Sequence, residues 1–184
     1  MTILAKRKKT AIADTITFQF RTLVPTDGMA LHRLVRACSP LDLNSLYCNL
    51  LQCSHFKNTS IAAVSDDNLV GSVTGYHIPD RPDTLFIWQV AVHPEARGKG
   101  LARTMLRKLL ERMATQGIHF VETSITLSNE ASLRLFTGFA TEQHANMVRS
   151  VMFEQESHFE GIHETEYLFR IAPFDDAIHS HATN

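Results

Sequence analysis

The residues best placed for chemistry follow a strand-like run, Val90-Ala91-Val92, in a turn that holds two glycines and opens a helical pattern. Several backbone N–H groups at the start of a helix have no intrahelical acceptor, and the helix dipole adds partial positive charge there. Glycines let the backbone approach a phosphate closely, so the turn predicts a phosphate or pyrophosphate site. The residues expected to form it are Arg97, Gly98, Lys99, Gly100, Leu101 and Ala102.

Two missing features narrow the kind of phosphate ligand. A nucleoside-triphosphate loop requires Ser or Thr after its Gly-Lys, whereas Gly100 follows Lys99. The dinucleotide-binding fingerprint requires three spaced glycines, and the residues after Gly100 do not continue that spacing. What remains is the pattern Arg-x-x-Gly-x-Ala with one additional glycine. A tight strand-to-helix turn without any ligand is the alternative.

This loop resembles the pyrophosphate loop of the GNAT acetyltransferases, which bind acetyl-CoA. Three further segments match that family in order and spacing: Val90-Ala91-Val92-His93-Pro94, Ser128-Asn129-Glu130-Ala131-Ser132 and Leu135-Phe136-Thr137-Gly138-Phe139. The resemblance implies that acetyl-CoA also contacts Val90, Val92 and Asn129. It further implies a mixed α/β fold, in which a central, mostly antiparallel twisted sheet is splayed in its middle and flanked by helices.

One departure from the GNAT pattern concerns the leaving group. Many members of the family carry a Tyr in the helix before Gly-Phe, and this Tyr protonates the departing CoA thiolate. Here the stretch is Ser132-Leu133-Arg134-Leu135-Phe136, which has no Tyr. The sequence therefore leaves the acid open: the thiolate departs unprotonated, or water protonates it.

Other strings resemble one branch of the family, the diaminobutyrate acetyltransferases of ectoine biosynthesis, over roughly residues 17–172. These strings are residues 39–47, 50–56, 87–92, 152–153, 158–159 and 163–166. The resemblance implies direct transfer, in a ternary complex, of the acetyl group of acetyl-CoA to the γ-amine of L-2,4-diaminobutyrate. The product is the immediate precursor of the osmolyte ectoine, and similar proteins are commonly homodimers.

The chemistry of such a substrate sets what the site must contain. An amine like that of lysine has a pKa of ~10.4, and only the neutral amine attacks a thioester. Supplying it at pH 7 costs about 4–5 kcal/mol without help. The site needs a proton acceptor, an anion for the other ammonium, and N–H groups or a cation for the carboxylate. Main-chain donors of the splayed strand are the expected oxyanion stabilisers.

Three candidates for the substrate pocket lie in the first half of the chain. Asp42 either binds the substrate ammonium or caps the helix that follows, a role that Asn44 or Ser45 fills equally well. Asn44 is itself a candidate substrate ligand. By the resemblance, Tyr47 belongs to the catalytic pocket, although partly buried packing on its helix is the alternative. Trp88, the only Trp, either packs in the core or offers an aromatic face to an ammonium.

Two further candidates lie near the end of the chain. His163 and Glu166 stand three residues apart near the start of a strand. The resemblance favours a place in the catalytic pocket, with Glu166 as the base or as an ammonium anchor. A polar surface pair is the alternative. The string from His163 to Tyr167 lacks the second His of the zinc-protease helix, so no metal is expected.

Composition excludes several other classes of protein. The chain holds 18 basic and 19 acidic residues, which gives no basic excess for nucleic acid. No apolar run approaches the ~20 residues that cross a bilayer, so no membrane is expected. Cys38, Cys48 and Cys53 are odd in number and fit no zinc spacing, which predicts reduced thiols in a cytoplasmic protein.

The elements around these residues are expected to form one domain, residues 17–173, between a flexible basic tail at 1–16 and a flexible tail at 174–184. Alternation predicts strands at 15–24, 60–64, 69–78, 84–92, 119–126 and 166–172. Helical spacing predicts helices that begin near residue 26 and span 44–56, 100–115 and 128–136. Residues 139–155 look extended but weakly patterned.

Two functions compete with acetyl transfer to diaminobutyrate. The first is acetylation of another small amine, such as a polyamine or an aminoglycoside; a polyamine lacks the carboxylate of diaminobutyrate. The second is a non-catalytic acyl-CoA sensor on the same fold. A sensor would keep the glycine loop and lose the acidic pocket residues, whereas Asp42 and Glu166 are both present.

Overall fold

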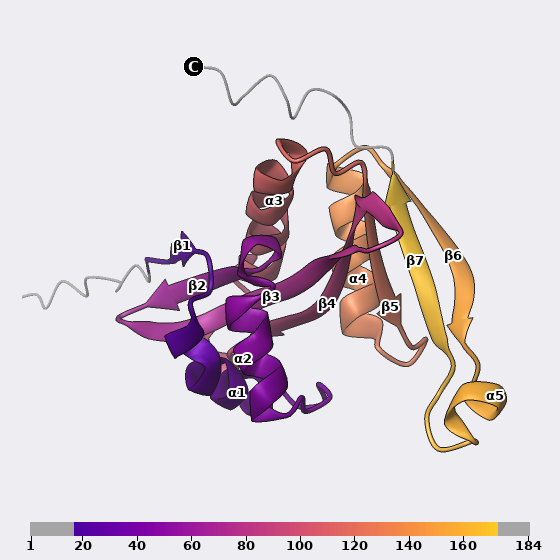
Figure 1. Cartoon of the computed structure of the whole chain (residues 1–184), viewed down its shortest axis with the longest axis horizontal. Coiled ribbons are helices and arrows are strands. Elements are labelled where there is room, and N and C mark those ends of the chain that lie inside the picture. Colours follow the sequence, from indigo (N-terminus) through magenta and orange to yellow (C-terminus); the bar gives the residue numbers. More distant parts are fainter. Residues whose placement is uncertain (1–16, 173–184) are drawn as a thin grey trace, which may run out of the picture.

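The computed structural model describes residues 17–172, which form one seven-stranded sheet in the order β1-β2-β3-β4-β5-β7-β6 (Figure 1). The strands are β1 (Gln19–Arg21), β2 (Ile61–Ser65), β3 (Asn68–Ile78), β4 (Arg81–Val92), β5 (Phe120–Ile125), β6 (Asn146–Phe153) and β7 (Glu166–Ala172). All neighbours in the sheet are antiparallel except β4 and β5. The predicted mixed α/β, mostly antiparallel fold is confirmed; the predicted tails at 1–16 and 174–184 lie outside the described residues.

Helices cover both faces of this sheet. The helices are α1 (Gly28–Ala37), α2 (Leu46–Ser54), α3 (Leu101–Ala114), α4 (Glu130–Glu142) and the short α5 (Gln155–Phe159), with 3-10 turns at Pro25–Asp27, Lys57–Thr59 and Pro94–Ala96. Buried side chains of α3 and α4 share one hydrophobic cluster with Ile87 and Phe169, and those of α1 and α2 share another with Ala62 and Ala91. The two clusters therefore lie on opposite faces of the sheet.

The helix after the glycine turn follows the predicted pattern closely. α3 buries an apolar stripe at helical spacing: Leu101, Met105, Leu106, Leu109, Leu110 and Met113. The chain leaves the helix through Gly117, whose φ of 79° is the left-handed conformation that glycine adopts at least cost. None of the helices between residues 17 and 172 is long and apolar enough to cross a membrane.

The last third of the described chain differs from the predicted elements. α4 continues to Glu142, past the predicted end at residue 136, because Phe139 and Ala140 extend its buried face. Gly138 is tolerated inside it because Arg103 packs there: a Cβ on Gly138 would lie 2.5 Å from Arg103 Nη2. The weakly patterned residues 139–155 thus divide between the end of α4 and strand β6, and α5 was not predicted.

A bulge in β4 opens the sheet in its middle. Ile87 lies opposite Gly75 and Gln89 opposite Thr74, so Trp88 is an extra residue on β4. The strands approach closely there, since a Cβ on Gly75 would lie 2.5 Å from Phe86 O. β4 and β5 pair only from Thr84–Phe120 to Ile87–Thr123. Beyond that point no strand within residues 17–172 pairs with the edge of β4 that faces β5.

An ion cluster holds the strands together on the paired side of this opening. Glu122 on β5 is 1% exposed and receives hydrogen bonds from Arg81 at the start of β4 and from Arg170 on β7. A buried carboxylate needs such partners, because removing an unpaired charge from water is costly.

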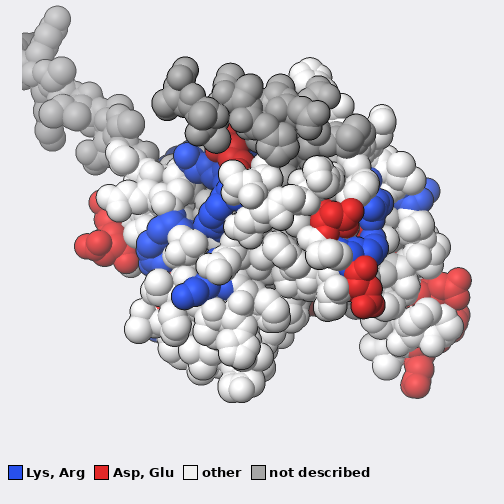
Figure 2. Space-filling view, turned by 45° about the horizontal axis from the view of Figure 1, so that its top comes forward, with Lys and Arg blue, Asp and Glu red and all other residues white. Residues whose placement is uncertain are grey.

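On the face in Figure 2, acidic and basic groups are scattered among wide areas of other residues.

Candidate active site

A cavity of about 560 Å³ lies where β4 separates from β5. Its walls come from the α1–α2 loop, the bulged part of β4, the end of β5, the start of α4, and the chain around the start of β7. The predicted site residues that line it are Asp42, Asn44, Trp88, Val90, Asn129, His163 and Glu166. The fold thus brings together, at one opening, residues from four separate parts of the sequence.

Glu166 at the start of β7 has the properties of a proton acceptor. Burial raises the pKa of its carboxyl; a hydrogen bond from Ser124 and the positive charge of a nearby His163 oppose this rise, while Asp42 adds to it. Its Oε2 atom is buried and has no hydrogen-bond partner among the described residues. A half-buried carboxylate that lines a cavity and has an unpaired oxygen can take a proton from a bound amine.

Ser124 on β5 was not singled out from the sequence. It lies opposite Leu168 in the β5–β7 ladder, two residues along β7 from Glu166, and is near enough to the Glu166 carboxylate to lower its pKa. A serine in a strand has no sequence signal of its own, so only the pairing of β5 with β7 identifies it.

His163 is held in one orientation by the unpredicted helix α5 and the loop after it. Its Nδ1 lies 2.8 Å from Glu164 O. A carbonyl oxygen only accepts, so Nδ1 carries a proton in this contact. Phe159 of α5 packs against the imidazole with 4.8 Å between ring centroids.

The α1–α2 loop supplies the opposite wall. Ser45 caps α2, since its Oγ accepts from Cys48 N at 3.1 Å. Asp42 therefore does not cap the helix, and the capping alternative for this residue is wrong. Asn44 Nδ2 donates to Gln89 Oε1, and Gln89 Nε2 donates to Asp42 O. Gln89 was also not singled out from the sequence.

Trp88 and Tyr47 have different surroundings. Trp88, the bulge residue, is 42% exposed, lines the cavity and contacts Tyr76 edge-to-face at 6.2 Å, so its ring is only partly packed. Tyr47 is 70% exposed and is not part of the cavity wall. The buried face of α2 carries Asn49, Gln52 and Cys53, which leaves Tyr47 on the solvent side. The structure does not bring Tyr47 into the predicted catalytic pocket.

The glycine turn has the backbone expected of an anion site. Gly98 and Gly100 have φ of 75° and 69°, left-handed values that favour glycine. The N–H group of Thr104 donates to Gly100 O, which is the first hydrogen bond of the helix. The N–H groups of the first three helical residues therefore have no acceptor within the helix. Arg97 Nε donates to Val92 O at 3.1 Å and braces the turn against the end of β4.

The remaining cofactor candidates contribute in different ways. The Leu101 side chain is buried in the core, so only its backbone can reach a ligand, whereas Lys99 is exposed. Asn129 caps α4 through Oδ1, which accepts from Ser132 N at 3.1 Å, and the cap does not use its NH2 group. Phe136 lines the cavity, as do the hydroxyl-bearing residues Ser124, Thr126, Ser128 and Ser132, but no described Tyr does.

Replacing Gly100 by Val is expected to weaken acetyl-CoA binding about tenfold, the loss of roughly one hydrogen bond to a charged group. No atom of the described residues lies within 4 Å of a Cβ at Gly100, so the new side chain would occupy the space above the turn. Isothermal titration calorimetry measures the dissociation constant.

The matched control for this change is Gly117→Val. Gly117 lies at the other end of α3, also has positive φ, and also has open space around its Cβ position. Both variants therefore carry similar backbone strain. Equal dissociation constants for the two variants would mean that the turn does not bind the cofactor.

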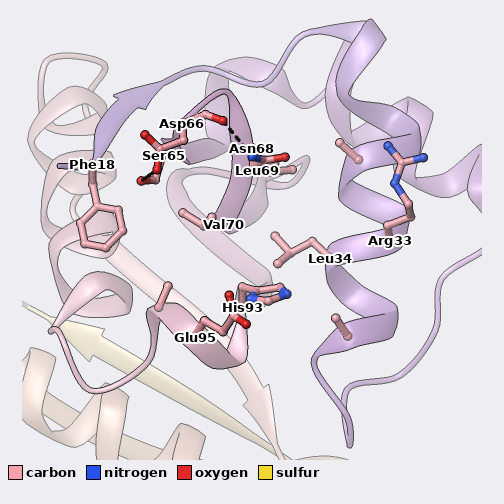
Figure 3. Close-up of a pocket in the computed structure, with 13 residues that line it drawn as sticks. Phe18, Arg33, Leu34, Ser65, Asp66, Asn68, Leu69, Val70, His93 and Glu95 are labelled. Atoms are coloured by element: carbon pink, nitrogen blue, oxygen red, sulfur yellow. Dashed lines mark hydrogen bonds between the residues drawn. The ribbon is translucent and has the colours of Figure 1, made fainter. Parts of the chain in front are cut away.

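A second cavity, of about 580 Å³, lies between α1, the β2–β3 turn and the Pro94–Ala96 turn (Figure 3). Phe18, Leu34 and Val70 contribute apolar surface, and Asp66 and Glu95 stand among its polar residues. None of the predicted site residues lines it, and none of its polar side chains is buried without a partner. No three His, Cys, Asp or Glu side chains within residues 17–172 are grouped to hold a metal ion.

Comparison with known proteins gives concordant matches. The acetyltransferase (GNAT) family model matches residues 29–139. An L-2,4-diaminobutyric acid acetyltransferase of Methylotuvimicrobium alcaliphilum is 52% identical over 147 residues, which is 80% of this chain and 86% of that protein. The enzyme of the same name from Vibrio cholerae is 50% identical over 152 residues, 83% and 88% of the two chains.

Solved structures extend the comparison. The diaminobutyrate acetyltransferase from Paenibacillus lautus, in complex with its substrate L-2,4-diaminobutyric acid and coenzyme A, superposes with a TM-score of 0.82 at 37% identity, covering 87% of this chain and 97% of that one. The ribosomal-protein-S18-alanine N-acetyltransferase from Escherichia coli has a TM-score of 0.68 at 13% identity, over 86% and 95% of the two chains, and shares the fold.

Proposed function

The chain belongs to the acetyltransferase (GNAT) family and, within it, to the L-2,4-diaminobutyric acid acetyltransferases, and on this premise we propose that it transfers the acetyl group of acetyl-CoA to the γ-amine of L-2,4-diaminobutyrate. The product, N-γ-acetyl-diaminobutyrate, is a precursor in ectoine biosynthesis. The observation that carries the proposal is the half-buried Glu166 carboxylate, which lines the cavity where β4 leaves β5 and whose Oε2 has no hydrogen-bond partner among the described residues.

The mechanism is direct attack in a ternary complex. The turn at residues 97–102 binds the pyrophosphate, and the unpaired edge of β4 after Ile87 offers main-chain groups to the rest of the cofactor. Glu166 takes one proton of the γ-ammonium, and the neutral nitrogen attacks the thioester carbonyl. Collapse of the tetrahedral intermediate then breaks the C–S bond and releases the CoA thiolate, and the nitrogen loses its second proton to the thiolate or to water. N–H groups on the same edge of β4 stabilise the oxyanion, because they are fixed in place before the reaction.

The two carboxylates suit a substrate that carries two amines. Asp42 contributes to the raised pKa of Glu166, so the two groups are close enough to interact through space. A ligand with two ammonium groups relieves this repulsion, with one amine at each carboxylate. We assign the α-ammonium to Asp42 and the γ-amine to Glu166, with Trp88 and Asn44 beside them in the cavity wall.

We also propose that the protein is a homodimer that works in the cytoplasm. Strand β6 is an edge strand whose Val148 and Val151 are 65% and 51% exposed, and Ile162 beyond it is 88% exposed. Exposed apolar residues along a sheet edge favour a contact with another chain. The three free cysteines favour a reducing compartment. Light scattering coupled to size-exclusion chromatography measures the mass and tests the dimer.

The function is tested by thiol release from acetyl-CoA with three amines. L-2,4-diaminobutyrate should be turned over, and L-2-aminobutyrate, which lacks the accepting γ-amine, should release no thiol above background. 1,4-Diaminobutane, which lacks the carboxylate, should be turned over at least tenfold more slowly, the effect of about one charged hydrogen bond. Faster turnover of 1,4-diaminobutane would assign the chain to polyamines. Acetyl-CoA binding without turnover of any amine would indicate a sensor.

A further inference from the structure

We propose that Gln89 is a positioning residue that fixes the substrate loop, residues 39–45, against β4; this inference rests on the proposed function for its kinetic consequence. Gln89 Nε2 donates to Asp42 O at 3.0 Å, and Gln89 Oε1 accepts from Asn44 Nδ2 at 3.2 Å. One side-chain amide thus holds the backbone of one proposed substrate ligand and the side chain of another.

The loop depends on these bonds because it has little structure of its own. Residues 42–45 belong to no helix or strand. Within residues 17–172, the two hydrogen bonds to Gln89 are the ones that join the substrate loop to the sheet. Just before the loop, Cys38 Sγ donates to Val92 O at 3.2 Å, which ties the end of α1 to the same strand. The loop is therefore fastened at its start and again at Asp42 and Asn44.

The β4 bulge explains why Gln89 can reach the loop. Side chains alternate between the faces of a strand, so Ile87, Gln89 and Ala91 would share one face in a regular β4. Ile87 instead packs in the cluster with α3 and α4, while Ala91 packs in the cluster with α1 and α2. The extra residue Trp88 reverses the alternation, so Gln89 lies on the face of α1 and α2.

The same bulge therefore does two things at once. It separates β4 from β5, which opens the cavity for the thioester, and it turns Gln89 toward the loop that carries Asp42. The side of the cavity that receives the acetyl group and the side that receives the amine are therefore both positioned by β4. A loop fixed to that strand keeps the Asp42 carboxylate at a constant distance from the reacting carbon, which is the condition for a high effective concentration of the amine.

The experiment compares Gln89→Leu, which keeps the volume and loses both bonds, with the wild type in two measurements. Hydrogen–deuterium exchange of the peptide that covers residues 39–45 should be faster in the variant, while exchange in β5 stays unchanged. The kcat/KM for diaminobutyrate should fall roughly 5- to 50-fold, as expected for two neutral hydrogen bonds. The KM for acetyl-CoA should change less than twofold.

A second variant and a double-mutant cycle keep the test decisive. Gln89→Glu keeps the shape and the acceptor for Asn44 Nδ2 but sets a carboxylate oxygen against Asp42 O, where no donor remains, so it too should speed exchange in residues 39–45 and lower kcat/KM relative to the wild type. Combining Gln89→Leu with Asn44→Ala should cost less than the sum of the single changes. Additive losses would mean that Gln89 acts independently of the loop, and would overturn the proposal.

The exchange measurement separates this inference from the proposed function. If the wild type fails to acetylate diaminobutyrate, the function is wrong, yet exchange in residues 39–45 still reports whether Gln89 holds the loop. Unchanged exchange in both Gln89 variants would overturn the positioning role. Faster exchange together with unchanged kcat/KM for diaminobutyrate would also overturn it, because the loop would then not need to be fixed.

Discussion

Replacing Glu166 by Gln is expected to lower kcat/KM for diaminobutyrate roughly 10²–10⁴-fold, the usual contribution of a positioned general base. The same substitution is expected to raise the melting temperature at neutral pH. Burial raises the pKa of Glu166, which means that the charged carboxylate is less stable in the folded protein than in the unfolded chain. The glutamine side chain has the same shape and no charge, so it removes the free-energy cost of burying the carboxylate and also removes the proton acceptor.

The direction of the pH dependence follows from the raised pKa. The folded state binds this proton more readily than the unfolded state, so the destabilising effect of Glu166 is present above its folded pKa and disappears as the pH falls below the unfolded value. The stability gained by Glu166→Gln should therefore shrink toward acidic pH. Wild-type kcat/KM should fall as the pH drops through the raised pKa, because a protonated base cannot accept.

A neighbouring carboxylate provides the control. Glu164 is exposed, lies two residues from Glu166 and, like Asp42, adds to the rise in its pKa. Glu164→Gln should keep kcat/KM within about twofold, since exposed charges interact weakly. Steady-state kinetics and thermal unfolding over the same pH range measure both effects. Wild-type turnover by Glu166→Gln would remove Glu166 from the role of base.

Replacing Asp42 by Asn is expected to lower kcat/KM for diaminobutyrate about 10- to 150-fold. A hydrogen bond to a charged group contributes about 1.5–3 kcal/mol, and the substitution removes the charge while keeping the shape. The KM for acetyl-CoA and the melting temperature should barely change, because Ser45 rather than Asp42 caps α2. Steady-state kinetics with each substrate varied in turn separates the two KM values.

The Asp42→Asn variant should also change the pH profile. Asp42 is one of the groups that raise the pKa of Glu166, so removing its charge should shift the acidic limb of the profile to lower pH. Asp67→Asn, in the exposed β2–β3 turn, is the control. It should change neither kcat/KM nor the pH at which the acidic limb of the profile falls. A wild-type kcat/KM in the Asp42→Asn enzyme would mean that Asp42 does not bind the substrate ammonium, and Glu166 would remain as its only proposed carboxylate ligand.

The parts of the site that the sequence predicted are those encoded by local spacing. The strand, the glycine turn and the helix with its buried stripe follow one another in the chain, so the turn and α3 were predicted nearly residue by residue, whereas binding of the cofactor there stays a prediction. Glu166 was predicted at the start of β7, where it lies. Both predictions needed no knowledge of which strands are neighbours.

The parts that could not be predicted depend on contacts between distant segments. The bulge at Trp88 is defined by the register of β4 with β3. The sequence of β4 alone therefore does not predict that the Gln89 side chain lies on the opposite face of the sheet from Ile87. Ser124 acquires its role from pairing with β7, and α5, only five residues long, is too short for a periodic signal. Tyr47 was assigned to the pocket by resemblance, whereas the orientation of α2 directs it to solvent.

The assignment of the γ-amine to Glu166 is tested most directly by NMR of the product formed from L-2,4-diaminobutyrate and acetyl-CoA. If Glu166 deprotonates the γ-amine while Asp42 holds the α-ammonium, the amide proton of the product should couple to the Cγ methylene protons, and the Cα proton should keep its shift next to a free ammonium. A product acetylated mainly on the α-nitrogen would contradict the account, since the substrate would then lie in the cavity with its two amines exchanged.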